Sequence, residues 1–558
     1  MDPIYTELIH EIKATQMTAS QLTKLKRQLC LKYSTKKPPT NFEILLNASP
    51  SDRSLIQKKI LVKPVRTASG VSPVAIMTAP FACSHGKCTF CPGGPNSYYG
   101  NVPQSYTGHE PTTMRAIRNN YDAYLQVFNR LEQYVALGHN HDKIELIVMG
   151  GTFPSMPVDY QNGFIRDAFA AMNDFSMLFY KDGELLFEKF KDFFELPGDV
   201  GSSIRTEHIH AKLLELKRES ATTLLDEQIR NETSQVRCVA LCIETKSDWG
   251  FFEHGNRMLD QGCTRVEIGV QSVYDDVLKK VHRGHDSADT KKSFQILKDL
   301  GFKISAHYMP GLPLTDEKRD IEGFKQIFSN PDYRPDMLKI YPTMVAPGTA
   351  LYVEWKQGKF MPLTADQAAQ RIVKMKEYIP RYCRVQRVLR DVPTKMWAAG
   401  VEFTNLRQHM VGKYKPKCEC IRCREPMGQA IDYDALKLNV YEYESNGGKE
   451  FFISLDDTTH DLIVGFCRLR FPCEALRSEI TLTSALVREL HVYGTATALG
   501  SEGSVQHKGY GKMLLKKAED IAVSRGKNKM VVISGVGVRE YYRKLGYVSE
   551  GPYVVKKV

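Results

Sequence analysis

CSHGKCTFCPGG, at residues 83–94, places three cysteines within nine residues, directly after the apolar run SPVAIMTAPF at residues 72–81. That run is too continuously apolar for a half-exposed strand, so it predicts a buried strand of a parallel sheet. Clustered thiols favour a metal site over disulfides. A zinc ion would need a fourth ligand, for which His85 is a candidate, whereas an iron–sulfur cluster held by three cysteines leaves one iron open for a substrate.

Five more apolar runs follow the cysteine loop, with helical stretches between them, at residues 143–152, 239–246, 265–272, 303–311 and 337–345. They predict an α/β fold with a partial or full TIM-type barrel over residues 73–345, in which working residues gather where the strands end. Residues 158–236 read as a mostly helical insertion. Gly150, Gly151, Thr152 and Gln271 lie at such strand ends, on the same rim as the cysteine loop.

This order, a three-cysteine loop after the first strand and a glycine-rich end on the second, resembles the radical S-adenosylmethionine (SAM) enzymes. The resemblance implies that Cys83, Cys88 and Cys91 hold a [4Fe-4S] cluster. It also implies that the strand-end residues bind SAM, namely Gly150, Gly151, Thr152 and Gln271. The cysteine spacing is four residues and then two, where the superfamily usually has three and then two.

Residues 439–558 show a different pattern, with strands separated by turns, a hairpin turn at Asn446 and one helix after QHKGYG at residues 506–511. Glycines before a helix let backbone N–H groups approach a pyrophosphate. The segment resembles a GNAT-type α+β acetyltransferase domain. The resemblance implies acetyl-CoA bound by Glu489, Leu490, His491, Val492, Gln506, Gly509, Tyr510, Gly511 and Lys512, with Tyr542 near the thioester. Tyr542 has a plain alternative as a core aromatic residue.

The linking region, residues 346–438, holds a second cysteine group at Cys418, Cys420 and Cys423. A structural zinc site is the natural interpretation, because the region is short of apolar residues and a metal can supply folding energy. Cys383 or His409 could be the fourth ligand. Three reduced thiols without metal remain the alternative.

The chain has 558 residues and a formal charge of +12, from 76 Lys and Arg against 64 Asp and Glu, which favours a polyanionic partner. Its N-terminal segment, residues 1–72, is helical and basic, with Lys36, Lys37, Lys63 and Arg66 prominent. Phosphate contact and an ordinary solvated face are both open readings of that segment. No run of 18 apolar residues or secretory leader is seen, so a cytoplasmic location without membrane contact is expected.

The combination of a radical SAM barrel and an acetyltransferase domain resembles the family of the catalytic subunit of Elongator and its stand-alone archaeal and bacterial relatives. The match spans about residues 61–558. It rests on KPVRTASG, CxxxxCxxCPGGP, QSYTGHEPTTMRAIRNNYD, MGGTF, GVQS, YPT, NLRQ, VRELHVYG and ISGVGVREYYRKLGY.

The resemblance implies modification of the wobble uridine of tRNA at C5, with SAM and acetyl-CoA as cofactors and an electron donor for the cluster. It assigns Lys143 to acetyl-CoA, although a solvated strand-end lysine is the plain alternative, and Lys143 and Tyr542 are the catalytic candidates. Arg115, Arg118 and Lys339 are further candidates for RNA contact. Homodimerisation and Elongator-type subunits both remain open. The rival functions are a protein lysine acetyltransferase and a non-catalytic tRNA-binding subunit that responds to acetyl-CoA.

Overall fold

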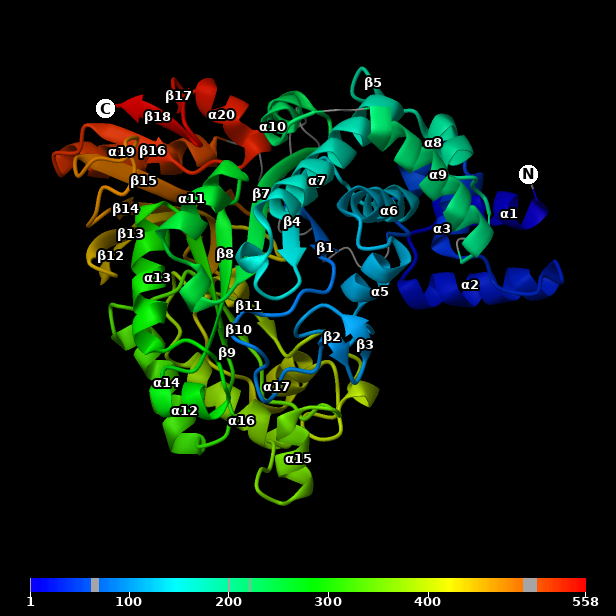
Figure 1. Ribbon diagram of the computed structural model, residues 1–558. Coiled ribbons are helices and arrows are strands. Elements are labelled where there is room, and N and C mark those ends of the chain that lie inside the picture. Colours follow the sequence, from blue (N-terminus) through cyan, green and yellow to red (C-terminus); the bar gives the residue numbers. More distant parts are fainter. Residues whose placement is uncertain (1, 62–69, 199–200, 220–221, 495–508) are drawn as a thin grey trace.

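The structure, a computed structural model, describes residues 2–61, 70–198, 201–219, 222–494 and 509–558. Two seven-stranded sheets form its centre, one in the middle of the chain and one near the C-terminus, and the N-terminal helices lie at the opposite side from the C-terminal sheet (Figure 1).

The first sheet is an open half barrel of parallel strands with β1 and β11 at its two edges. In spatial order it contains β1 (Ser72–Met77), β4 (Lys143–Met149), β7 (Arg237–Thr245), β8 (Arg265–Gln271), β9 (Lys303–Tyr308), β10 (Met337–Ile340) and β11 (Arg384–Val388). The six strands predicted from the apolar runs are all present. The seventh, β11, lies within the predicted linking region, for which the sequence predicts no strand.

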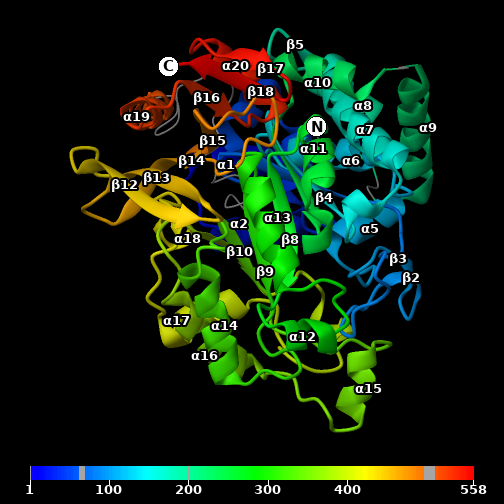
Figure 2. The same ribbon diagram turned by 60° about the vertical axis from the view of Figure 1, so that its left-hand side comes forward.

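Helices cover the convex face of this half barrel (Figures 1 and 2). The strands present alternate apolar residues to that face, such as Ile144, Leu146 and Val148 of β4, which are fully buried. The covering helices include α6 (Ala123–Ala136), α7 (Val158–Phe179), α10 (Leu224–Thr233), α11 (Phe252–Asp260), α13 (Ser287–Asp299), α14 (Glu317–Ser329) and α16 (Ala365–Lys376). The expected helical insertion is therefore present, as α7 to α10.

The other described elements between β1 and the second sheet are short hairpins and further helices. The hairpins are β2 (Gly94–Ser97) with β3 (Gly100–Val102), and β5 (Tyr180–Lys181) with β6 (Glu184–Leu185). The other helices are α5 (Pro111–Arg118), α8 (Phe187–Phe193), α9 (Ser203–Glu219), α12 (Asp275–Lys280), α15 (Ala350–Lys356), α17 (Leu406–Tyr414) and α18 (Ile421–Arg424).

The N-terminal segment folds into four helices, α1 (Pro3–Ala14), α2 (Ala19–Lys32), α3 (Asn41–Asn47) and α4 (Pro50–Ile56), around a small apolar core of their own. Capping boxes begin α2 and α3, at Thr18 and Thr40. The segment is attached to the barrel by Gln57, whose amide donates to the carbonyl of Gly138 at 2.7 Å.

The second sheet is mixed and packs one helix, α19 (Tyr510–Ser524), against the face that is turned away from the barrel. Its spatial order is β12 (Leu436–Ser445), β13 (Gly448–Asp457), β14 (Leu462–Phe471), β15 (Ser484–Val492), β16 (Lys529–Val532), β18 (Tyr553–Lys557) and β17 (Val548–Glu550), and the short helix α20 (Arg539–Arg543) follows β16 in the chain. The predicted hairpin turn is present, because Asn446 and Gly447 both have positive φ, as a tight turn between twisted strands requires.

Buried charges join the two sheets rigidly. Arg488 of β15 donates to both carboxylate oxygens of Asp336, at 2.8 and 2.7 Å, and Arg470 of β14 donates to Asp299 at 2.8 Å. Such bidentate pairs are directional, and losing one partner would leave a buried charge unpaired. The position of the C-terminal sheet against the amino ends of the barrel strands is thereby fixed.

Candidate active sites at the two ends of the half barrel

A cavity of about 460 Å³ lies at the carboxyl ends of the barrel strands and is lined by Cys83, Cys88 and Cys91. The loop side chains around the sulfurs are polar. Gln104 donates to Cys91 Sγ at 3.0 Å, and Arg283 donates to Cys88 Sγ at 3.6 Å. Donors of this kind stabilise thiolate sulfur, the form that binds iron.

The two glycines after β4 have backbone conformations that favour glycine, with φ of +136° at Gly150 and +96° at Gly151. A Cβ at Gly150 would stand 1.9 Å from the Thr78 hydroxyl, so no side chain fits there. Gly151 and Thr152 line the cysteine cavity, and Thr152 Oγ1 is 3.8 Å from Cys83 Sγ. The strand end therefore offers exposed backbone beside the cysteines.

Unpartnered polar atoms around this cavity test whether an additional group fits. Gln271 Oε1 and His85 Nδ1 are buried and have no hydrogen-bond partner among the residues that the structure describes, and both residues line the cavity. Gln271 also has a positive φ of 68°, which is uncommon for a residue with a side chain. Burial raises the pKa of the Cys83 and Cys88 thiols, a cost that bound metal would remove. The residues present therefore fit a cluster with a polar ligand beside it.

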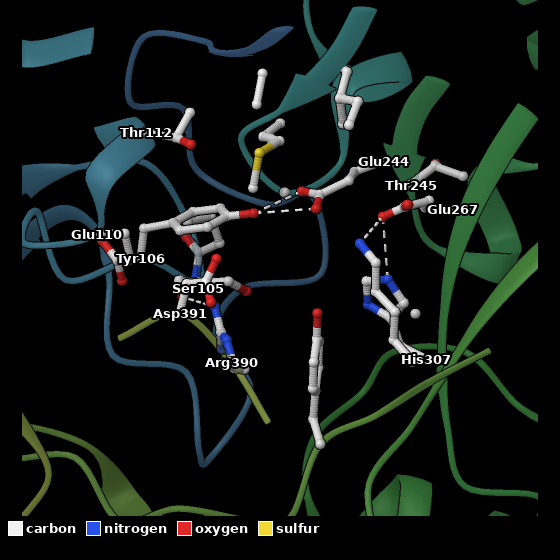
Figure 3. Close-up of a pocket in the computed structure, with 18 of the residues that line it drawn as sticks. Ser105, Tyr106, Glu110, Thr112, Glu244, Thr245, Glu267, His307, Arg390 and Asp391 are labelled. Carbon is white, nitrogen blue, oxygen red and sulfur yellow. Dashed lines mark hydrogen bonds and ion pairs between the residues drawn. The ribbon is translucent and has the colours of Figure 1, made fainter. Parts of the chain in front are cut away.

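The far wall of the cysteine cavity is polar as well (Figure 3). Tyr106 donates to Glu244 at 2.8 Å, and burial raises the pKa of this glutamate. Deeper inside, Lys339 donates to Glu267, and His307 Nε2 lies 3.3 Å from the same carboxylate. Figure 3 shows the Tyr106 and Glu244 side chains pointing toward one another within the pocket.

A second cavity, of about 540 Å³, lies between the amino ends of the barrel strands and the second sheet. It opens where β15 and β16 diverge: their parallel pairing runs from Ser484 to Val487, and beyond it β15 stays paired with β14 alone. A bulge at Arg488 marks the point of divergence. The backbone edge of residues 488–492 therefore faces the cavity, where an extended amide chain such as pantetheine can pair with it.

Most residues predicted to bind acetyl-CoA line this second cavity. They are Lys143, Glu489, Leu490, His491, Val492, Gly509, Tyr510, Gly511, Lys512 and Tyr542, while Gln506 lies outside the described residues. Gly509, with φ of +85°, is the N-cap of α19, so the helix begins at the cavity with its free N–H groups. Tyr542 belongs to the core of its domain and also lines the cavity.

Charge shapes the barrel side of the second cavity. Burial lowers the pKa of Lys143 from its usual value. Burial opposes ionisation of Glu489, but Lys303 and Arg468 more than offset it and lower the pKa of this carboxyl to about 2. Burial also lowers the pKa of His491. Glu489 is thus held ionised beside a neutral imidazole.

The second cysteine group is compact, with the sulfurs of Cys418, Cys420 and Cys423 all within 4.8 Å of one another. A tetrahedral zinc site places sulfurs about 3.8 Å apart, so the group fits that metal. Neither candidate fourth ligand joins it within this distance among the described residues. His409 Nε2 is instead 3.0 Å from Asp366.

The predicted RNA-contact residues fall into different environments. Lys36, Lys37 and Arg118 are exposed, and Lys63 and Arg66 lie outside the described residues. Lys339 and Arg115 both line the cysteine cavity. Lys339 pairs with Glu267, and Arg115 donates to the carbonyl of Ala75 at 2.6 Å.

Comparisons with known protein families divide the chain along these lines. Residues 1–68 match the ELP3 N-terminal domain, 80–322 the Radical SAM superfamily, 335–415 the Radical_SAM C-terminal domain and 420–547 the Acetyltransferase (GNAT) family. A protein of Methanocaldococcus infernus named tRNA uridine(34) acetyltransferase is 44% identical over 93% of this chain and 92% of its own length. Human Elongator complex protein 3 is 39% identical over 96% of this chain and 93% of its own.

The chain belongs to the Elongator complex protein 3 family. The solved structure of the archaeal Methanocaldococcus infernus Elp3 with N-terminus deletion (1-46) agrees, with a TM-score of 0.71 and 39% identity over 88% of this chain and 100% of that one. The family and the fold expected from the motifs are thereby confirmed. As a radical SAM protein with a GNAT domain, this Elp3-family chain is an enzyme whose families imply a [4Fe-4S] cluster, SAM and acetyl-CoA. No helix among its described residues is long and apolar enough to cross a membrane.

Several lining residues of this Elp3-family chain were not singled out from the sequence. At the cysteine cavity these are Gln104, Tyr106 and Arg283, and at the second cavity Lys303, Arg384 and Tyr541. Gln104 and Tyr106 do lie within the motif QSYTGHEP, which carries part of the family match. The remainder come from separate elements, so local sequence contains no signal that joins them.

Proposed function

We propose that this chain modifies the wobble uridine of tRNA, adding a two-carbon unit from acetyl-CoA to C5 of the base by radical chemistry. Hydrolysis of the thioester would leave a carboxymethyl-type group. Membership of a family with relatives named tRNA uridine(34) acetyltransferase supports the reaction and the substrate.

The observation that carries the proposal is the sharing of one half barrel by two cavities. Glu145 and Arg265 line both the cysteine cavity and the cavity beside Gly511. An acetyltransferase acting on protein lysines needs no cysteine cavity, and a radical enzyme acting alone needs no acyl-CoA cavity. A reaction that joins an acetyl carbon to an unactivated ring carbon needs both.

At the cysteine cavity, Cys83, Cys88 and Cys91 would hold the cluster, and Gly150, Gly151, Thr152 and Gln271 would hold SAM. Together these groups supply a carbon radical able to remove hydrogen from a methyl group that ordinary bases leave untouched. The chain would orient the cofactors: Arg283 and Gln104 donate to two of the sulfurs, and the glycine backbone lets a ligand approach closely. An external electron donor is required.

At the second cavity, the edge of residues 488–492 would pair with pantetheine, and the start of α19 would receive the pyrophosphate. Lys143 and Tyr542, from the barrel and the acetyltransferase domain respectively, are the proposed catalytic pair near the thioester. Their presence in one lining supports an acetyl carrier that touches both domains.

The remaining parts receive supporting roles. Residues 1–72, with Lys36 and Lys37 exposed, would contact the RNA backbone, and residues 73–345 and 439–558 would supply the two chemistries. The linking region 346–438 would carry structural zinc on Cys418, Cys420 and Cys423. The uridine has to be unstacked to reach the cavity, which the single-stranded anticodon loop permits. A tRNA substrate makes the cytoplasm the proposed location, and Elongator-type subunits or a second copy are the proposed partners.

The test is to give the anaerobically reconstituted protein tRNA, SAM, reductant and acetyl-CoA labelled with ¹³C on its methyl carbon. Nucleosides are then analysed by mass spectrometry. Labelled carboxymethyl-type uridine is the expected product. Label on protein lysines in place of tRNA would indicate a protein acetyltransferase, and tRNA binding without label anywhere would indicate a non-catalytic subunit.

A further inference from the structure

The concave face of the half barrel runs without interruption from one cavity to the other. Side chains alternate along a strand, so every second residue shares a face. On β8 this face carries Arg265 and Glu267, then Gly269 and Gln271; Arg265 lines the acetyl-CoA cavity, and all four line the cysteine cavity. On β4, Lys143 at one end lines the acetyl-CoA cavity. Met149 at the other end, six residues or about 20 Å further along, lines the cysteine cavity.

The face is polar where a barrel is ordinarily apolar. The interior of such barrels is usually filled by branched aliphatic side chains. Here the concave positions hold Glu145, Arg265, Glu267, His307 and Lys339. The convex face of the same strands keeps the usual apolar residues, such as Val266, Ile268 and Ile304, all fully buried.

Stability alone does not account for these charges. Replacing buried ion pairs by packed apolar residues is often neutral or stabilising, so a purely structural core has no need of them. They are paired with one another: Arg265 with Glu145, and Lys339 with Glu267. Because these charges are paired with one another, they make the lining polar without holding a small polar group at one place, so such a group can move along the lining.

We propose that this concave face is an internal passage that brings the acetyl unit from the acetyl-CoA cavity to the cysteine cavity, and that the Glu145–Arg265 ion pair is its partition. The inference rests on the proposed function, since it supplies the route that the reaction requires. The cargo is a two-carbon acyl group, either still attached as a thioester or released as acetate.

The partition can open without leaving either charge alone. Arg265 also lies 3.5 Å from Glu267 and donates to Cys242 Sγ at 3.2 Å, so it keeps partners if it turns away from Glu145. Glu145 in turn is under the positive charge of Lys303 and Arg384 as well as Arg265. An exchange of partners within this network moves the guanidinium aside at small electrostatic cost.

Ser305 lies on β9 between Lys303, which lines the acetyl-CoA cavity, and His307, which lines the cysteine cavity. Ser305 is fully buried and its hydroxyl donates to Gln386 at 3.0 Å. It lines neither cavity, so a larger side chain here adds bulk midway without removing a residue of either site. Ser305→Leu is therefore the plug, and Ser305→Ala is its matched control.

Three readouts separate the passage from the two sites: acetyl-CoA affinity by calorimetry, SAM cleavage to 5′-deoxyadenosine, and transfer of ¹³C from the acetyl methyl group to tRNA. Ser305→Leu should keep the first two within about twofold and lose transfer by at least tenfold, whereas Ser305→Ala should transfer like wild type. If Ser305→Leu does not fold, Cys242→Leu with its control Cys242→Ala repeats the test on β7, where Cys242 lies between Ala240 of the acetyl-CoA cavity and Glu244 of the cysteine cavity.

The cargo is identified by supplying ¹³C-methyl acetate in place of acetyl-CoA. Label from acetate alone means that the free carboxylate travels, and label from acetyl-CoA only means that the thioester end does. With acetyl-CoA as the source, a folded plug variant that transfers label at the wild-type rate overturns the passage. A wild-type protein that completes both half-reactions and labels no tRNA would instead contradict the proposed function.

Discussion

Gly511→Glu should greatly weaken the binding of acetyl-CoA while leaving the fold and the cysteine cavity intact. Gly511 is the second residue of α19 and lines the acetyl-CoA cavity. A Cβ there would stand 2.9 Å from the hydroxyl of Tyr541, the movable end of a side chain, so the backbone can accept it with a small shift. The added carboxylate, however, points where the pyrophosphate is proposed to bind.

The size of the effect follows from Coulomb's law. A carboxylate about 5 Å from a phosphate charge is repelled by roughly 1–3 kcal/mol at effective dielectric constants between those of water and a protein surface. Pyrophosphate carries at least two such charges, so a loss of about 3 kcal/mol, or roughly 150-fold in Kd, is expected. Salt should reduce the loss in part, because the site is open to solvent.

Calorimetric titration with acetyl-CoA measures the change directly, and two variants serve as controls. Gly511→Ala tests the contact with Tyr541 without charge. Met513→Glu puts the same charge in the same helical turn, but Met513 is 48% exposed and does not line the cavity. Both controls should bind within a few-fold of wild type, and acidic residues in the first turn should not destabilise the helix. Equal affinities for Gly511→Glu and Gly511→Ala would refute the pyrophosphate site.

Three further outcomes are expected. Cys88→Ala should lose iron–sulfur absorbance and 5′-deoxyadenosine formation and keep its tRNA affinity; a variant that still modifies tRNA would overturn the cluster assignment. If Lys36 and Lys37 each contact one phosphate of single-stranded RNA, replacing either by Ala should reduce the slope of log affinity for tRNA against log salt concentration by about 0.7. Unchanged slopes would show that the N-terminal segment does not contact the tRNA. Burial raises the pKa of Glu489, but the positive charges of Lys303 and Arg468 outweigh burial and lower this pKa to about 2. The ionised Glu489 therefore stabilises the folded state above its unfolded pKa, and this stabilisation is lost as the pH falls toward 2. Urea midpoints of Glu489→Gln should accordingly fall less than those of wild type between pH 5 and 2.

Much of the fold is predictable because its signals are local. The six predicted barrel strands are continuous apolar runs, and α19 follows a glycine that takes a positive φ as its N-cap. The missed strand, β11, reads Arg384-Val-Gln-Arg-Val, in which three of the five residues are polar. It looks like an exposed segment, although one of its faces is turned into the polar half barrel.

The sites are only partly predictable, because their contacts join distant parts of the chain. The clustered cysteines and glycines can be recognised from the sequence, because residues that are close in the sequence are also close in space there. The Arg265–Glu145 pair joins residues 120 positions apart, and no local pattern reveals it. Lys339 shows the same limit, since a lysine on a strand reads as a surface charge until Glu267 is seen beside it.

The most direct test of the central claim uses acetyl-CoA carrying three deuterium atoms on its methyl group, with tRNA, SAM and reductant, under anaerobic conditions. Radical attack at that methyl group predicts one deuterium in 5′-deoxyadenosine and two in the new side chain of the wobble uridine. A product that retains all three deuterium atoms, or 5′-deoxyadenosine without deuterium beside unmodified uridine, would contradict the account.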